Sequence, residues 1–189
     1  MNILITICAR GGSKGIPGKN IKPIAGQALI AYSIATANKF LENYPGQLVL
    51  STDSEEIREV AKGYGLISDY QRPASLATDK SGKIGAIEDV LLSTESKRGV
   101  VFDYILDLDV TSPLRTVEDL ESAFQLIIAD KEANNLFSVS DANRNPYFNM
   151  VEKRGDYYFK VKDLGSILSR QEAPVVYDMN ASFYFYRRS

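Results

Sequence analysis

An uninterrupted apolar segment near the start of the chain constrains the fold most strongly. Residues 3–8 read ILITIC, which is typical of a central strand of a parallel sheet covered on both faces. Apolar residues then recur with helical spacing at positions 30, 34, 37 and 41, and a second strand begins at residues 48–50. This order predicts a right-handed strand–helix–strand unit.

The alternation of strands and helices continues along the chain. Asp53 followed by Glu56 resembles a capping box at the start of the next helix. The patterns predict helices within residues 57–64, 84–91 and 117–127, and strands at residues 66–67, 104–108 and 136–139. We therefore expect an α/β fold with a mostly parallel sheet. Because ligands bind beyond the carboxyl ends of such strands, one face should carry the loops 10–20, 52–54 and 109–115.

The sequence changes character after residue 142. Residues 147–151 and 157–161 flank the turn Arg154-Gly155-Asp156 and predict a β-hairpin, and residues 182–186 predict a final strand. Many of the 11 tyrosines and 8 phenylalanines lie in this region, more rings than a small hairpin buries alone. An exposed aromatic face of this kind indicates a partner surface. We expect two domains, residues 1–142 and residues 143–189.

Composition excludes several kinds of chemistry. The chain has 189 residues, no histidine and one cysteine, which excludes His-dependent triads, His-ligated zinc and an intramolecular disulfide. Cys8 is expected to be a plain buried thiol. A formal net charge of −2 argues against nucleic-acid binding. No apolar run approaches the roughly 20 residues of a membrane span, and no signal peptide is evident, so we expect a cytoplasmic protein.

The loop after the first strand carries the strongest functional signal. Residues 9–20 read ARGGSKGIPGKN and place three cations, Arg10, Lys14 and Lys19, among glycines. Glycine-rich backbone and clustered cations suit a triphosphate. The loop is neither a Walker A motif nor a GxGxxG motif. The alternative is a solvated basic turn.

The motifs in this chain resemble those of the acylneuraminate cytidylyltransferases, also called CMP-sialic acid synthetases. Those motifs are ICARGGSKGIPGKN at 7–20, STD at 51–53, RPASLA at 72–77, TSPLR at 111–115 and NAS at 180–182. The segments LDLD at 106–109, RNPYFN at 144–149 and YDMNAS at 177–182 resemble the branch that activates legionaminic acid.

This resemblance implies a fold, a reaction and a set of binding residues. The fold is a Rossmann-like domain of the nucleotide-diphospho-sugar transferase type with a small hairpin, residues 143–189, that forms a homodimer. The reaction is transfer of CMP from CTP to a nine-carbon keto-acid sugar, assisted by Mg²⁺. Lys19, Arg10 and Asp109 are the expected catalytic residues. CTP is expected to be bound by Ala9, Arg10, Gly12, Ser13, Lys14, Lys19, Asn20, Arg72 and Asp79.

The acidic pair Asp107 and Asp109 has several interpretations. An Asp-x-Asp at a strand end is a possible metal site. Asp109 alternatively acts as a base toward the attacking hydroxyl, contacts the sugar, or is a structural carboxylate. Arg115 holds the triphosphate or the sugar, or pairs with a carboxylate. The resemblance further implies that Arg170, Gln171 and Asn180 face the sugar, with Arg170 on its carboxylate.

The resemblance also predicts a longer chain. Family members continue past the last strand into a segment with another Asp-x-Asp motif, so we expect this chain to be C-terminally truncated. The alternatives to an active enzyme of this kind are a non-catalytic nucleotide-binding fragment and a sugar-1-phosphate nucleotidyltransferase.

Overall fold

The structure, a computed structural model, describes residues 1–165 and 167–188. The chain divides into two compact units. The first comprises Met1–Phe137 with Ala181–Ser189, and the second comprises Ser138–Asn180. This division differs from the expected boundary at residue 142, because the last strand returns to the sheet of the first unit.

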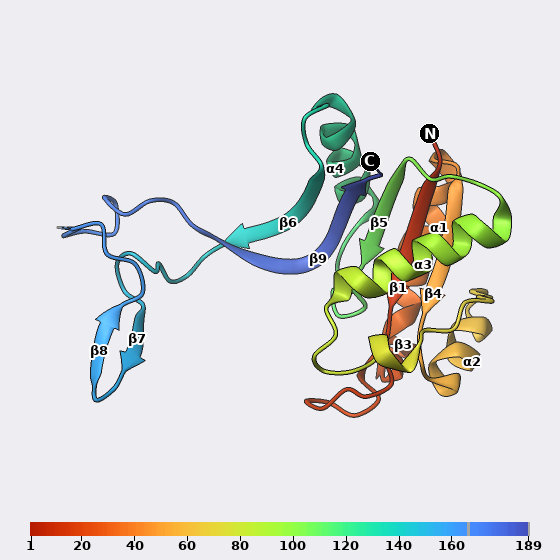
Figure 1. Ribbon diagram of the computed structural model, residues 1–189, viewed down its shortest axis with the longest axis horizontal. Coiled ribbons are helices and arrows are strands. Elements are labelled where there is room, and N and C mark those ends of the chain that lie inside the picture. Colours follow the sequence, from red (N-terminus) through yellow and green to blue (C-terminus); the bar gives the residue numbers. More distant parts are fainter. Residues whose placement is uncertain (166, 189) are drawn as a thin grey trace. The chain divides into compact units, whose positions relative to one another are not determined.

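The first unit is built on a five-stranded sheet with the order β4-β1-β5-β9-β6 (Figure 1). The strands β1 (Ile3–Cys8), β4 (Gly46–Ser51) and β5 (Tyr104–Leu108) are parallel, and β9 (Tyr177–Arg187) runs antiparallel to β5. The strand β6 (Asn135–Asp141) lies beside β9. The predicted mixed α/β fold with a mostly parallel central sheet is confirmed.

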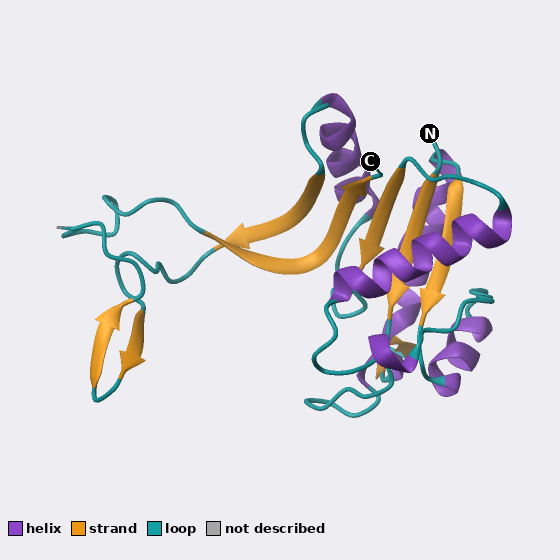
Figure 2. Cartoon of the chain, in the orientation of Figure 1, coloured by secondary structure: helices purple, strands orange, loops and turns teal. Residues whose placement is uncertain are grey.

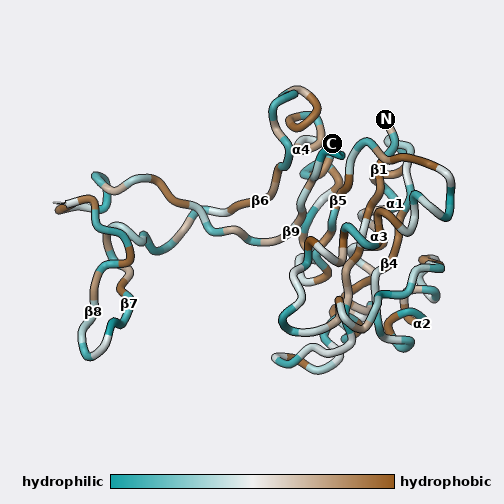
Figure 3. The backbone as a smooth tube through the Cα atoms, in the orientation of Figure 1, coloured by the Kyte–Doolittle hydropathy of each residue, from teal (hydrophilic) through white to brown (hydrophobic). Residues whose placement is uncertain are grey.

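Helices cover both faces of this sheet (Figure 2). One face packs against α1 (Leu29–Asn43), α2 (Glu55–Gly63) and α4 (Val117–Ala129), and the other against α3 (Lys83–Arg98). Ile3, Ile5 and Ile7 of β1 face the first group of helices, whereas Leu4 packs with α3. Burial on both faces explains the uninterrupted apolar run of β1, and Figure 3 shows hydrophobic residues along the central strands.

Local signals explain the helix ends, with one correction. Thr116 and Asp119 form a reciprocal capping box at α4. The cap of α2 is Ser54, whose hydroxyl accepts from the amide of Ile57, and not Asp53 as expected. Asp53 instead accepts a hydrogen bond from the amide of Gly11, at 2.9 Å, and so ties the loop after β1 to the loop after β4.

Residues 66–67, expected to be a strand, form no strand: Leu66 is buried, but Ile67 is 79% exposed. Short elements complete the first unit, namely β2 (Pro23–Ile24), β3 (Gln27–Ala28) and the 3-10 helices η1 (Lys19–Ile21) and η2 (Ala74–Leu76).

The second unit contains a hairpin of β7 (Val151–Arg154) and β8 (Tyr157–Lys160). Gly155 adopts a positive φ of 64° in its two-residue turn, as the sequence indicated. The first hairpin strand begins later than expected, because residues 146–149 form a turn. Across the described residues, no helix combines the length and apolar character needed to cross a membrane.

Candidate active site

A cavity of about 610 Å³ opens at the carboxyl ends of β1 and β5. Three segments enclose it: the loop after β1, the stretch from Arg72 through η2 into α3, and the loop after β5. Five cationic and two acidic side chains line it, so the cavity is electropositive and suits a polyanion. The charged residues are Arg10, Lys14, Lys19, Arg72, Lys83, Asp79 and Asp109.

Backbone and amide contacts shape the loop after β1. The side chain of Asn20 is buried, and its amide donates to the carbonyl of Arg10 at 3.1 Å. A Cβ atom at Gly11 would lie 2.9 Å from the Cβ of Ser54, so only glycine fits this close approach. Gly18 adopts a φ of 64° just before η1. These contacts hold Lys19 at the cavity wall, where it forms no ion pair with any residue that the structure describes.

Asp79 neutralises two of the loop cations. Its carboxylate lies 2.8 Å from Nη1 of Arg10 and also pairs with Lys14. Hydrogen bonds from Lys14 and Arg10 hold the pKa of Asp79 below its usual value. A carboxylate therefore lies where the charge pattern favours phosphate oxygens.

Arg72 is fixed beside the end of β4. Its Nε donates to the hydroxyl of Ser51 at 2.9 Å, and its Nη2 donates to the carbonyl of the same residue at 3.0 Å. Its own amide donates to the carbonyl of Thr52. The side chain is buried and lines the cavity, so its charge is presented from a rigid position.

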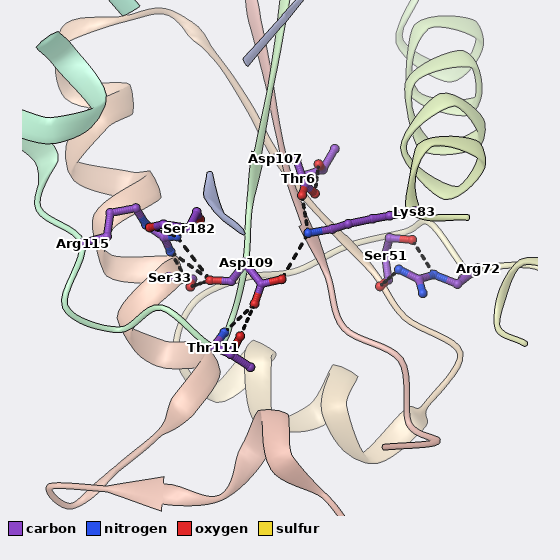
Figure 4. Close-up of polar contacts among 10 residues, drawn as sticks. All are labelled: Thr6, Ser33, Ser51, Arg72, Lys83, Asp107, Asp109, Thr111, Arg115 and Ser182. Atoms are coloured by element: carbon purple, nitrogen blue, oxygen red, sulfur yellow. Dashed lines mark hydrogen bonds and ion pairs between the residues drawn. The ribbon is translucent and has the colours of Figure 1, made fainter. Parts of the chain in front are cut away.

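The first residue of α3, Lys83, joins the two aspartates at the end of β5 (Figure 4). Its Nζ lies 2.5 Å from Oδ2 of Asp107 and 3.3 Å from Oδ2 of Asp109. Burial would lower the pKa of Lys83, but the charges of the two aspartates outweigh it and raise that pKa. Lys83 is therefore protonated at neutral pH.

Asp109 reaches the cavity, whereas Asp107 is fully buried behind it. Both the amide and the hydroxyl of Thr111 donate to Oδ1 of Asp109. Burial would raise the pKa of Asp109, but Lys83 and the hydrogen bonds from Thr111 lower it below its usual value. Asp109 is thus an ionised acceptor at neutral pH and a poor match for a base that must gain a proton near pH 7.

Arg115 organises the backbone behind the cavity and does not line it. Its guanidinium donates to the carbonyl oxygens of Asp109 and Ser182 and to the hydroxyl of Ser33 (Figure 4). Burial lowers its pKa to about 10, so it stays charged at neutral pH. Its partners are carbonyls and hydroxyls, whereas the sequence suggested a triphosphate, a sugar or a carboxylate. Arg115 borders a separate cavity of about 370 Å³ between α1 and the start of α4.

Cys8 ends β1 at the cavity wall. Burial, reinforced by the negative charge of Asp107, raises the pKa of its thiol to about 12. The side chain is only partly buried, so the expectation of a plain buried thiol is only partly met.

The Asp107–Asp109 pair does not fit a metal site as it stands. Three of its four carboxylate oxygens accept hydrogen bonds, from Thr6, Thr111 and Lys83, and the fourth, Oδ2 of Asp107, forms an ion pair with Lys83. Within residues 1–165 and 167–188, no group of three or more acidic or cysteine residues is arranged to hold a metal ion. Within the described residues, this pair therefore offers Mg²⁺ no ready site, and the expected use of Mg²⁺ stays a prediction.

The structure brings together most of the predicted nucleotide residues. Those lining the cavity are Arg10, Ser13, Lys14, Lys19, Asn20, Arg72, Asp79 and Asp109. Ala9, Gly12 and Asp107 lie outside its lining. Ala9 is buried, and its amide extends the sheet by donating to the carbonyl of Ser51.

The three expected sugar residues of the hairpin region, Arg170, Gln171 and Asn180, belong to the second unit. There Nη2 of Arg170 donates to the carbonyls of Ala142 and Asn143. Asn180 accepts from the hydroxyl of Ser138 at 2.6 Å. Their contact with a sugar stays a prediction.

Sequence reasoning missed Lys83. The segment Ser81-Gly82-Lys83 could have pointed to it, because a glycine precedes the lysine just before an apolar helical pattern. Gly82 caps α3 without a side-chain hydrogen bond, and the first turn carries no acidic residue. The helix start is thus electropositive and faces the cavity, which Gly82, Lys83 and Ala86 all line.

The arrangement of sheet and cavity defines a nucleotidyltransferase-type α/β fold. It resembles a structure of CMP:2-keto-3-deoxy-manno-octonic acid synthetase complexed with CTP, with a TM-score of 0.69 and 19% identity over 99% of this chain and 74% of that one. Residues 4–189 match the Cytidylyltransferase family, and the chain belongs to that family.

Two relatives are each 43% identical over 187 residues, which cover 98% of this chain and 77% of theirs. One is the post-translational flagellin modification protein B of Campylobacter coli, and the other is the CMP-N,N'-diacetyllegionaminic acid synthase of Campylobacter jejuni. The family expected from the motifs is confirmed.

Proposed function

We propose that this chain transfers CMP from CTP to the anomeric hydroxyl of a nine-carbon keto-acid sugar and releases pyrophosphate. The observation that carries the proposal is the electropositive cavity at the carboxyl ends of β1 and β5, in a chain that belongs to the cytidylyltransferases. The relative named for CMP-N,N'-diacetyllegionaminic acid synthesis favours a legionaminic acid as the acceptor.

In the proposed reaction the anomeric oxygen attacks the α-phosphorus of CTP. A new oxygen–phosphorus bond forms, the bond from that phosphorus to the β-phosphate breaks, and the hydroxyl proton is released. The protein's task is to position the groups and to stabilise negative charge. Lys19 and Arg10, from the loop after β1, are the candidates for this task, and Arg72 adds a fixed charge to the same cavity.

Asp109 is suited to orient the attacking hydroxyl. It is ionised, its Oδ1 is held by Thr111 and its Oδ2 by Lys83, and it borders the cavity. An ionised carboxylate accepts a strong hydrogen bond from a hydroxyl. We therefore assign Asp109 to orientation of the sugar hydroxyl.

We also propose that the second unit makes a homodimer. Its hairpin exposes three consecutive aromatic residues, Tyr157, Tyr158 and Phe159, with exposed fractions of 73%, 66% and 46%. Aromatic surface of this extent is typical of protein interfaces. Light scattering on Tyr157→Ser/Tyr158→Ser should show monomers where the parent chain is dimeric. Leu114→Ser, which removes an exposed apolar residue of the first unit, is the control and should leave the dimer intact.

A panel of acceptors tests the proposed reaction. The chain is incubated with CTP, Mg²⁺ and either N,N'-diacetyllegionaminic acid, N-acetylneuraminic acid or a sugar 1-phosphate, and pyrophosphate is measured. Release with a keto-acid sugar supports the proposal, and its loss on chelation supports the Mg²⁺ requirement. Release only with the sugar 1-phosphate indicates a sugar-1-phosphate nucleotidyltransferase. If calorimetry shows that CTP binds but no pyrophosphate is released with any acceptor, the chain is a nucleotide-binding module.

A further inference from the structure

Lys83 lies between two carboxylates that share one face of the strand end. Asp107 lies in β5 and Asp109 directly follows it, and the ion pairs of both with Lys83 place their carboxylates on the same side. Oδ1 of each accepts from a threonine: Thr6 for Asp107, at 2.8 Å, and Thr111 for Asp109. The two Oδ2 atoms both face Nζ of Lys83, at 2.5 Å and 3.3 Å.

This arrangement requires a cation. The side chain of Asp107 is completely buried, and a buried ionised carboxylate is strongly unfavourable without an opposite charge. The second carboxylate adds like-charge repulsion. In an Asp-x-Asp pair, a divalent ion commonly supplies the compensating charge. Here a side chain from the first turn of α3 supplies it.

Lys83 is held firmly in this position. Its side chain is 34% exposed, and its ammonium group also lies 5.7 Å from the ring centroid of Tyr184. The attraction of both aspartates keeps it protonated. A charged group with these contacts behaves as a fixed ion, because its stem comes from a helix that packs on the sheet.

We propose that Lys83 takes the place of a divalent cation between Asp107 and Asp109, and that it positions the Asp109 carboxylate toward the cavity. The Asp-x-Asp pair of this chain is then not a metal site in the nucleotide-free protein. Only the consequence for the orientation of the sugar hydroxyl rests on the proposed function. The charge arrangement itself is independent of it.

Manganese binding tests the proposal without any sugar or CTP. Electron paramagnetic resonance measures free Mn²⁺ during titration of the wild type and of Lys83→Met. We expect no stoichiometric site in the wild type below about 1 mM Mn²⁺, and one site at least about tenfold tighter in Lys83→Met, because the two carboxylates are then uncompensated. Adding Asp109→Asn to Lys83→Met should remove the site. Lys83→Arg, which keeps the charge, should bind like the wild type.

The control is Lys97→Met, which removes the same charge from the other end of α3. It should bind Mn²⁺ like the wild type. Two results overturn the proposal: a submillimolar Mn²⁺ site in the wild type that Asp109→Asn abolishes, or a Lys83→Met variant that binds no more tightly than the wild type.

Thermal unfolding with and without Mn²⁺ tests the proposal in a Lys83→Met variant that has lost stability. Lys83→Met leaves Asp107 buried without a counter-charge, so its Tm should fall, and Mn²⁺ should raise that Tm but not the Tm of the wild type. Lys83→Met/Asp107→Asn removes both charges and should recover Tm without responding to Mn²⁺. A Lys83→Met variant whose Tm ignores Mn²⁺ contradicts the proposal. Absence of turnover with every acceptor would overturn the proposed function and leave these Mn²⁺ results to decide the role of Lys83.

Discussion

The guanidinium of Arg10 lies 2.8 Å from the carboxylate of Asp79, which also pairs with Lys14. Both cations belong to the loop assigned to the triphosphate, and Asp79 borders the same cavity. An internal carboxylate therefore pairs with cations that the proposed function assigns to phosphate oxygens. Under that function, Asp79 and the phosphates of CTP compete for these cations.

Asp79→Asn should consequently tighten CTP binding. Exposed ion pairs are individually weak, so we expect the Kd measured by calorimetry to fall by about threefold to tenfold. The gain should shrink at high ionic strength, where such pairs are screened. Asp69→Asn removes an exposed aspartate paired with Lys97 and Arg98 and serves as the control. Weaker CTP binding in Asp79→Asn would instead place this carboxylate in contact with the nucleotide.

Lys19→Ala should reduce turnover by on the order of a hundredfold or more, as for loss of a preorganised charge that stabilises the transition state. Lys19 lines the cavity, whereas Lys22 lies just beyond η1 with an exposed side chain, so Lys22→Ala is the matched control. Steady-state pyrophosphate release measures both variants. A change of less than about threefold in Lys19→Ala would remove Lys19 from the mechanism.

Arg115→Met should destabilise the fold by about 2–4 kcal/mol, because it leaves buried carbonyl and hydroxyl acceptors without a donor. The guanidinium links the loop after β5 to β9 through Asp109 and Ser182. Arg115→Lys should recover only part of the loss, since lysine lacks the planar fork. Urea denaturation measures the effect, with Arg98→Met at an exposed site as the control. Unchanged stability together with a higher KM for the sugar would place Arg115 on the acceptor.

The thiol of Cys8 should react very slowly in the folded protein. With a pKa of about 12 in place of the ordinary 9.0, its thiolate fraction at pH 8 is about 0.01%, against about 10% for a free thiol. Labelling with a disulfide reagent should be slow in the native chain and fast in urea. Rapid native labelling would contradict the raised pKa of this thiol.

The same shift in the pKa of Cys8 has a stability consequence. The folded state favours the protonated thiol of Cys8. Its contribution to the free energy of unfolding is therefore fully present below about pH 9 and is lost as pH rises toward about 12. Cys8→Ala should therefore show a shallower loss of unfolding free energy over that range than the wild type does.

Local patterns predicted most of the framework. The apolar run of β1, the periodicity of α1 and the glycine- and lysine-rich loop are properties of neighbouring residues, and the structure places them as expected. One error occurred where a distant contact decides the outcome. Asp53 holds the amide of Gly11 and leaves the helix cap to Ser54.

Two site residues illustrate the same limit. Lys83 meets Asp107 only because α3 packs on the sheet that contains β5, and no spacing in the sequence connects residues 83 and 107. Arg115 was expected to meet a triphosphate, a sugar or a carboxylate, but β9 returns beside β5 and brings the carbonyl of Ser182 to it. Pairings across the sheet are not encoded in local periodicity, so they emerge only from the folded chain.

Phosphorus NMR of the reaction mixture tests the central claim most directly. With CTP, Mg²⁺ and N,N'-diacetyllegionaminic acid, we predict that the three phosphate signals of CTP are replaced by one phosphodiester signal and by one pyrophosphate signal of twice its intensity, because pyrophosphate carries two equivalent phosphorus atoms. Persistence of the CTP signals with every keto-acid sugar, in a chain that folds and binds CTP, would contradict the proposed transfer of CMP.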